Sequence, residues 1–398
     1  MMESAPKIVL DNNSPLVTQV AQYLRSYIGA NLQTGDKLPS ERMLCKMFGV
    51  SRITVGKAIA SLVQEGVVYQ LHGSGTYVAD PAAADSSTIA VAVYHSDNAF
   101  YSKVVKAIQE EAAQAGFHTL LINTKGEREA ENIALRKLRG KVSGIILAPA
   151  MNADDEISSE LAALIGGNFP VVVICHSGRF PLPVNTVIPN YHLGGYLATS
   201  HLIERGYRRI LFGATGNIFY RQDIQLRFSG YLQALKDHRL AFHEEWLVMG
   251  DGQDVFNGFF QDGLQAAERV AALLEPDTAL FSLGDSFAIG LLRGLREKGI
   301  AVPEQCGLCG FDDIELAGQW GIELTTVKVL CEDIARESVR IVAEQIRRQH
   351  RLIENVITPV ELVPRRTTLG KGPRQRIGFP TGNKTGMVPP NQSFSNQN

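Results

Sequence analysis

Hydroxyl and basic side chains gather at the start of a predicted helix near the amino terminus. Ser51 is a suitable N-cap, and Arg52, Thr54 and Lys57 follow it. Guanidinium and hydroxyl groups in a first helical turn can reach base edges in a major groove, while the positive end of the helix dipole favours phosphate. The pattern indicates a reader of double-stranded DNA. For Lys57, exposure to solvent on a charged helix face is as well supported as contact with DNA.

A second set of polar side chains lies in the loops that follow predicted buried strands. His95, His176, Asp285 and Asp312 all occupy such positions. Ligand pockets of parallel sheets form beyond the carboxyl ends of strands, so these residues are candidates for binding a small polar molecule. Alternatives stay open, because a histidine at a strand end can simply satisfy backbone groups. Asp312 could also cap a helix, and Asp313 is expected to do so.

Metal and catalytic chemistry find little support in the sequence. Cys306 and Cys309 have the spacing of a metal or redox pair, but they lie in a predicted buried strand and no second pair follows at zinc spacing. Five cysteines scattered through apolar runs do not resemble a disulfide framework. Phosphate-binding loops and nucleophile elbows are missing. We therefore predict no enzyme activity, metal or cofactor, and a cytoplasmic protein with reduced thiols.

The elements that position the first set form a small module at residues 14–79. A helical apolar stripe covers 16–29, Ser40 caps a second helix that ends near Phe48, and the helix after Ser51 stops at Gly66. Residues 67–79 read as a hairpin with a glycine-rich tip. Two short helices around a tight turn, followed by a hairpin, predict a winged helix-turn-helix.

Residues 88–368 alternate short apolar runs with amphipathic helical patterns, which predicts α/β architecture with parallel sheets. The length favours two lobes over one sheet. A small polar stretch at 80–87 is the predicted linker, and the Pro-, Gly- and Asn-rich segment 370–398 is predicted to be disordered. The predicted buried strands are 89–95, 118–123, 144–148, 170–175, 209–214, 278–283 and 307–311.

Charge is divided unevenly along the 398 residues. The chain has 39 basic and 41 acidic residues, which excludes a wholly basic nucleic-acid coat. Residues 14–79 nevertheless carry six basic and three acidic residues, so a small basic module joins a mildly acidic body. The start of the chain shows no signal-peptide pattern, and no window has the apolar length of a membrane helix. We expect no membrane partner.

The amino-terminal module resembles the GntR family of DNA-binding domains over about 65 residues. The resemblance rests on the runs Gly35–Arg42, Gly49–Val55, Gln64–Gly66 and Gly73–Val78. It implies that Arg42 grips phosphate or a base near the groove edge, that Arg52 and Thr54 reach base edges, and that His72 and Gly73 enter the minor groove. Gly56 stands where this family usually has arginine. The predicted DNA-binding set is Arg42, Ser51, Arg52, Thr54, Lys57, His72 and Gly73.

The larger region resembles LacI-type effector domains, which share the two-lobed fold of periplasmic sugar-binding proteins. The carriers include Asn98–Tyr101, Val142–Leu147, His201–Ile210, Arg227–Tyr231 and Gly310–Ile314. The resemblance implies that Phe100 covers the ligand, that Arg227 binds its hydroxyls or a carboxylate, and that Asp312 accepts from sugar hydroxyls. Three positions depart from the family's residues: His95, His176 and Gly284. The predicted effector set is His95, Asn98, Phe100, His176, Arg227, Asp285 and Asp312.

Together these features predict a ligand-responsive transcriptional regulator, namely a homodimer that binds operator DNA and represses a carbohydrate-use operon until a small polar effector releases it. Two alternatives stay open. A solute-binding protein without a regulatory role would need a secretion signal and would not use residues 14–79. An enzyme fused to a DNA-binding domain, such as an aminotransferase-like protein, would need a lysine for a Schiff base in a suitable loop.

Overall fold

The computed structural model describes residues 15–33, 35–71, 75–79, 87–138, 140–150, 157–176, 180, 182–215, 222–250, 259–348 and 353–369. The predicted tail 370–398, all of the predicted linker except Ser87, and the predicted wing residues His72 and Gly73 lie outside these ranges.

The first described segment folds as the predicted winged helix-turn-helix. Ser40 Oγ accepts a hydrogen bond from Met43 N (3.3 Å), and Ser51 Oγ accepts one from Thr54 N (3.1 Å), so both predicted N-caps are confirmed. Gly49 ends the second helix in the left-handed conformation with φ 66°. The elements are α1 (Leu16–Asn31), α2 (Glu41–Phe48), α3 (Arg52–Gln64), β1 (Val68–Leu71) and β2 (Gly75–Val78).

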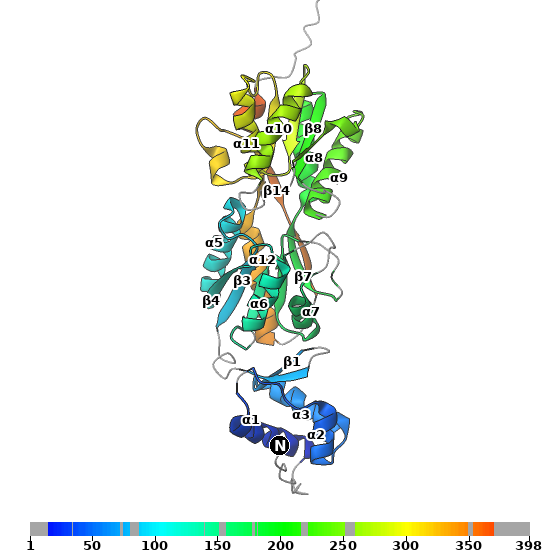
Figure 1. Ribbon diagram of the computed structural model, residues 1–398, viewed down its shortest axis with the longest axis vertical. Helices are drawn as coiled ribbons and strands as arrows, with labels where there is room; N and C mark the ends of the chain where they lie inside the picture. The colour runs from blue at the N-terminus through cyan, green and yellow to red at the C-terminus, as the bar shows by residue number, and fades with distance from the viewer. Residues whose placement is uncertain are drawn as a thin grey trace, which may run out of the picture.

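The rest of the described chain forms two α/β lobes, stacked above the winged helix in Figure 1. All strand pairs are parallel except β12 with β14. The sheet of the amino-terminal lobe has the order β13 (Asn355–Thr358), β7 (Asn185–Pro189), β6 (Val171–Ile174), β5 (Gly144–Leu147), β3 (Thr88–Val93) and β4 (His118–Asn123). The sheet of the carboxyl-terminal lobe has the order β14 (Val360–Val363), β12 (Thr325–Val329), β11 (Gly307–Asp312), β10 (Thr278–Ser282), β8 (Arg209–Thr215) and β9 (Leu247–Gly250).

Helices cover the sheets of both lobes. In the amino-terminal lobe they are α5 (Ala99–Gln114), α6 (Arg128–Leu138), α7 (Ser159–Gly166) and α12 (Cys331–Arg348). In the carboxyl-terminal lobe they are α8 (Tyr191–Glu204), α9 (Gln222–Asp237), α10 (Phe260–Ala272), α11 (Asp285–Glu297) and α13 (Arg366–Leu369), with short 3-10 turns η1 (Glu244–Trp246) and η2 (Glu315–Gly318).

The chain passes between the lobes three times, from β7 to α8, from β12 to α12 and from β13 to β14. The amino-terminal lobe is therefore completed by α12 and β13, which come after most of the other lobe in sequence. One apolar cluster includes buried residues of both lobes. This arrangement confirms the predicted two-lobed parallel architecture.

One predicted buried strand is exposed. β4 is the edge strand of its sheet and pairs only with β3. Leu120 and Leu121 retain 44% and 41% of their surface. The prediction that 118–123 is covered on both faces was wrong, because an apolar run does not distinguish an edge strand from a central one.

Glycines bring α8 and α9 into direct backbone contact. A Cβ atom on Gly195 would lie 2.0 Å from the carbonyl oxygen of Arg227, and one on Gly230 would lie 2.0 Å from that of His192. Any side chain at these positions would force the helices apart. The contact therefore fixes the backbone of Arg227 against the start of α8.

Candidate functional site

The first turn of α3 presents an exposed polar surface. Arg52 is exposed, and its Nε donates to Glu41 Oε2 across 2.9 Å. This hydrogen bond and the charge of Glu41 raise the pKa of the Arg52 guanidinium. The hydroxyls of Ser51 and Thr54 lie 2.8 Å apart, and Lys57 is exposed. The side chain of Ile53, which the sequence reading did not select, is also 73% exposed and could contact a thymine methyl group.

A groove of about 1060 Å³ runs beside this turn. Four basic side chains line it, of which Arg42 and Arg52 were predicted. Lys37 and Lys46 were not selected individually, although the net positive charge of the segment signalled them. The wall also includes Gln70 and Thr76 of the hairpin and Gly166–Asn168 of the amino-terminal lobe.

A buried charged cluster lies where the two lobes meet. Arg227 is 5% exposed, and its guanidinium lies 3.3 Å from Asp223 and 3.9 Å from Asp312. The rings of Tyr191 and Phe311 lie 4.6 and 4.2 Å from its Cζ atom. The Nε of Arg227 is a buried donor that meets no acceptor among the described residues. We call these five residues the interlobe cluster.

Sequence reasoning singled out Arg227 and Asp312 through the family resemblance and missed the other three. The spacing of Asp223 and Arg227, four residues apart, is a helical ion-pair pattern that could have revealed the acidic partner. Tyr191 and Phe311 become visible only in the fold, because they come from α8 and β11.

Asp285 holds the loop that follows Asp312 of the interlobe cluster. It is fully buried, and its carboxylate accepts hydrogen bonds from Ile314 N (2.9 Å) and Thr326 Oγ1 (2.5 Å). A Cβ atom on Gly284 would lie 3.3 Å from Asp312 Oδ2, so the glycine leaves room for that carboxylate. Through these two hydrogen bonds, Asp285 connects the loop after β11 to β12.

Asp313 does not cap a helix, as the sequence reading expected. Its carboxylate pairs with Arg365 across 2.7 Å, and η2 begins without a side-chain cap. The loop after β11 is already held by Asp285 and Arg365, which leaves no role for a cap. The carbonyl oxygen of Asp313 accepts from Lys103 Nζ of α5 across 2.8 Å. This hydrogen bond joins the two lobes.

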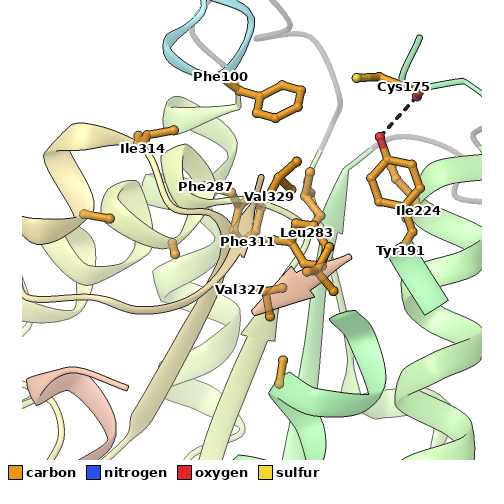
Figure 2. Close-up of a cluster of buried hydrophobic side chains, with 14 of the residues drawn as sticks. Phe100, Cys175, Tyr191, Ile224, Leu283, Phe287, Phe311, Ile314, Val327 and Val329 are labelled. Carbon is orange, nitrogen blue, oxygen red and sulfur yellow. Dashed lines mark hydrogen bonds between the residues drawn. The ribbon is translucent and has the colours of Figure 1, made fainter. Parts of the chain in front are cut away.

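The predicted residues of the amino-terminal lobe lie at the ends of its strands. Asn98 caps α5 by accepting from the backbone N–H groups of Phe100 and Tyr101. Figure 2 shows the ring of Phe100 above the strand ends that carry Phe311 and Leu283. Phe100 therefore lies near the interlobe cluster. Asn98 orients Phe100 by capping the first turn of α5.

The two histidines have different surroundings. His95 is buried, and burial lowers the pKa of its imidazole, although Asp97 opposes the shift. His176 is half-buried with its ring edge-on to Phe180 at 5.8 Å. Next to it, the Cys175 carbonyl accepts from the Tyr191 hydroxyl across 3.1 Å, a second link between the lobes (Figure 2).

Cys306 and Cys309 are fully buried, and their thiols contact the carbonyls of Gly307 and Gly310. Burial raises the pKa of Cys309 far above its usual value, which opposes thiolate chemistry. The described ranges contain no group of three His, Cys, Asp or Glu side chains suited to a metal. Within the same ranges, no helix has the length and apolar character of a membrane crossing.

Asp285 gives a testable pH dependence. Burial, reinforced by Asp312, raises the pKa of its carboxyl well above the usual range, although the hydrogen bonds from Thr326 and Ile314 oppose the shift. Because the pKa is raised in the folded state, the contribution of Asp285 to the free energy of unfolding is fully present below about pH 4. This contribution is lost as the pH rises through the folded-state pKa. Asp285→Asn should remove this loss, because the amide can accept from Ile314 and donate to Thr326.

The measurement is the free energy of unfolding by urea from pH 4 to pH 8. The stability of the wild type relative to Asp285→Asn should fall as the pH increases. Asp237→Asn, at an exposed position on α9, is the control for removing one carboxylate. A pH-independent difference between wild type and Asp285→Asn would refute the assignment.

Two known families match separate parts of the chain. Residues 16–78 match the family described as bacterial regulatory proteins, gntR family. Residues 199–368 match the periplasmic binding protein-like domain.

Individual relatives cover between 71% and 89% of the chain. The arabinose metabolism transcriptional repressor of Geobacillus stearothermophilus is 25% identical over 362 residues, which cover 89% of this chain and 98% of the relative. The transcriptional repressor PurR of Vibrio cholerae is 28% identical over 316 residues, covering 76% and 90%. A solved structure from Sanguibacter keddieii, assigned to the LacI family of transcriptional regulators, is 30% identical with a TM-score of 0.61 and covers 71% of this chain and 98% of that one.

Proposed function

Because the chain belongs to the regulators that join a GntR-type DNA-binding domain to a LacI-type effector domain, we propose that it represses a carbohydrate-use operon until a sugar-like effector releases it. The observation that carries this proposal is the presence, in one chain, of the exposed polar turn of α3 and the interlobe cluster around Arg227. The relatives are transcriptional regulators, which favours this function over an enzyme. Because this function requires operator DNA, the proposed location is the cytoplasm.

The charge of the interlobe cluster favours a neutral effector. One guanidinium faces the two carboxylates of Asp223 and Asp312, so an acidic ligand would add a third negative charge. A sugar can accept from the free Nε–H of Arg227 and donate to the carboxylates. The ring of Phe100, which lies above the strand ends (Figure 2), suits the C–H face of a pyranose or furanose. The arabinose repressor among the relatives makes pentoses the first candidates.

Effector binding is proposed to act through the hinge between the lobes. The hydrogen bonds from Lys103 to Asp313 and from Tyr191 to Cys175 join the two lobes beside the proposed effector site. A ligand that rearranges these contacts changes the angle between lobes, and it weakens DNA binding only as far as it binds the two states differently.

A homodimer is the proposed DNA-binding form. One winged helix buries too little DNA surface for useful specificity, and two-fold operators match two-fold dimers. Exposed apolar groups support self-association: Leu120 and Leu121 on the edge strand β4, and Trp320, which is 93% exposed, in the other lobe. Sedimentation equilibrium should give twice the mass of the chain, and a monomer at micromolar concentration would contradict this assembly.

The deciding experiment is a thermal-shift screen of the purified chain against pentoses, hexoses, polyols, sugar acids and nucleobases. A ligand at 100 times its Kd adds about 2.7 kcal/mol of stability, which is readily seen as a higher Tm. Hits are then added to the chain bound to a duplex that it has enriched from a random library. We expect a neutral sugar to raise the Tm and to release the duplex.

Other outcomes point to the alternatives. A sugar that binds while no duplex is ever enriched would indicate a solute-binding protein. Chemical conversion of the bound ligand would indicate a fused enzyme.

A further inference from the structure

The hairpin formed by β1 and β2, the wing, has two apolar faces. Val68 pairs with Val78, and both are buried in the core of the winged helix. Tyr69 pairs with Tyr77, and because side chains alternate along a strand, this pair faces the other way. The two tyrosine rings stack with centroids 5.6 Å apart and planes inclined by 19°.

The tyrosine face of the wing packs against the amino-terminal lobe. Tyr69 and Tyr77 contact an apolar cluster that includes Leu161, Leu164 and Ile165 of α7. The wing is thus held between the core of the DNA-binding domain and the core of the lobe above it (Figure 1).

The closest approach is between backbones. A Cβ atom on Gly167, just after α7, would lie 2.5 Å from the carbonyl oxygen of Gln70 in β1. Gly167 has φ −83° and ψ 6°, a conformation open to other residues. The glycine is therefore needed for space rather than for backbone freedom, and the space is occupied by the wing.

This docking places the lobe beside the DNA-reading side chains. Gly166–Asn168 form one wall of the groove whose other walls carry Arg42, Arg52 and Thr76. The groove holds only about 1060 Å³. A duplex that receives the first turn of α3 in its major groove, and whose backbone reaches Arg42 and the wing, approaches the same groove, so Gly166–Asn168 compete with it for this space.

We propose that the docked wing is a DNA-excluding state, in which the amino-terminal lobe holds the winged helix by Tyr69 and Tyr77 and must release it before DNA binds. The inference rests on the DNA-binding function proposed above. The observed DNA affinity is then the affinity of the released molecules multiplied by the fraction of molecules that are released. An effector that favours the docked state lowers DNA affinity further by linkage.

The test is Gly167→Leu in the full chain. The leucine cannot coexist with the Gln70 carbonyl in the docked arrangement, and it lies on the sensor rather than on the DNA-binding domain. We expect the Kd for a random-sequence 20-base-pair duplex at low salt to fall at least fivefold. The slope of log Kd against log salt should not change, because the phosphate contacts are the same. Gly29→Leu, at an exposed position on α1 with no atom within 4 Å of its Cβ, is the control and should bind as wild type does.

A second measurement uses the wild type and does not depend on folding of the variant. Hydrogen exchange of the amides of residues 161–169 should become faster when the duplex is added, because the wing leaves them. Equal or weaker DNA binding by Gly167→Leu, or slower exchange at 161–169 in the complex, would overturn the docking proposal while leaving DNA binding intact. Failure of wild type and variant alike to bind any duplex would overturn the proposed function as well.

Discussion

Replacing Arg227 by methionine should abolish the effector response and lower the free energy of unfolding by about 3–5 kcal/mol. The carboxylates of Asp223 and Asp312 are mostly buried, and the guanidinium is the cation that lies between them. Its removal leaves two negative charges in partial burial, and Tyr191 and Phe311 lose the flat group between them. Urea unfolding and the thermal-shift response to the effector measure the two losses separately.

Arg209 offers a matched control in the same lobe. It also forms an ion pair, with Glu275 at 3.1 Å, and lies near an aromatic ring, that of Trp246. Glu275 is largely exposed, so Arg209→Met should cost at most about 1 kcal/mol and leave the effector response intact. Arg227→Lys keeps the charge but not the flat fork, and its effector affinity should fall between those of wild type and Arg227→Met. A full effector response in Arg227→Met would remove the interlobe cluster from the binding site.

Replacing Arg52 by alanine should weaken binding to the enriched operator roughly 10- to 100-fold per half-site, and by the product of the two losses in a dimer. The side chain is exposed on the first turn of α3, where a base contact is geometrically accessible. Its guanidinium donates to Glu41, so DNA binding exchanges a carboxylate for a base or phosphate. Fluorescence anisotropy with operator and scrambled duplexes measures the affinity and the specificity ratio.

The pattern of losses identifies the type of contact. A base contact at Arg52 predicts a lower ratio of operator to scrambled affinity. Arg42→Ala, if Arg42 contacts phosphate, should weaken both duplexes alike and reduce the salt slope by about one. Glu41→Gln frees Arg52 and should bind at least as tightly as wild type. Equal losses on both duplexes for Arg52→Ala would assign it to phosphate.

The features that depend on residues close together in the chain were predicted best. The caps Ser40 and Ser51 and the left-handed Gly49 act within four residues, so their chemistry is visible in the chain itself. The continuous apolar runs likewise predicted β3, β5 and β6 in one sheet and β8, β10 and β11 in the other, but not the central strands β7 and β12. The family resemblance added Arg227 and Asp312, which are far apart in sequence and meet at 3.9 Å.

What the sequence could not supply depends on tertiary neighbours. The edge position of β4 is decided by which strand stands last in the sheet, and an apolar run carries no such information. Strands β13 and β14 contain polar residues and so lack the continuous apolar run that marks β5 and β6, which have the same length. The interlobe hydrogen bond of Lys103 joins positions 210 residues apart. Docking of Tyr77 on the lobe likewise has no local signature.

The threefold passage of the chain between the lobes also sets the order in which the protein can be completed during synthesis. The winged helix is finished once residue 79 has left the ribosome, whereas the lobe above it waits for α12 and β13, up to residue 358. At about 5–20 residues per second, that interval lasts roughly 15 to 55 seconds. For this period a nascent chain carries a complete DNA-reading module and no complete sensor. A stop codon anywhere in the interval would make the same state permanent, giving a fragment that carries the winged helix without the domain that responds to an effector.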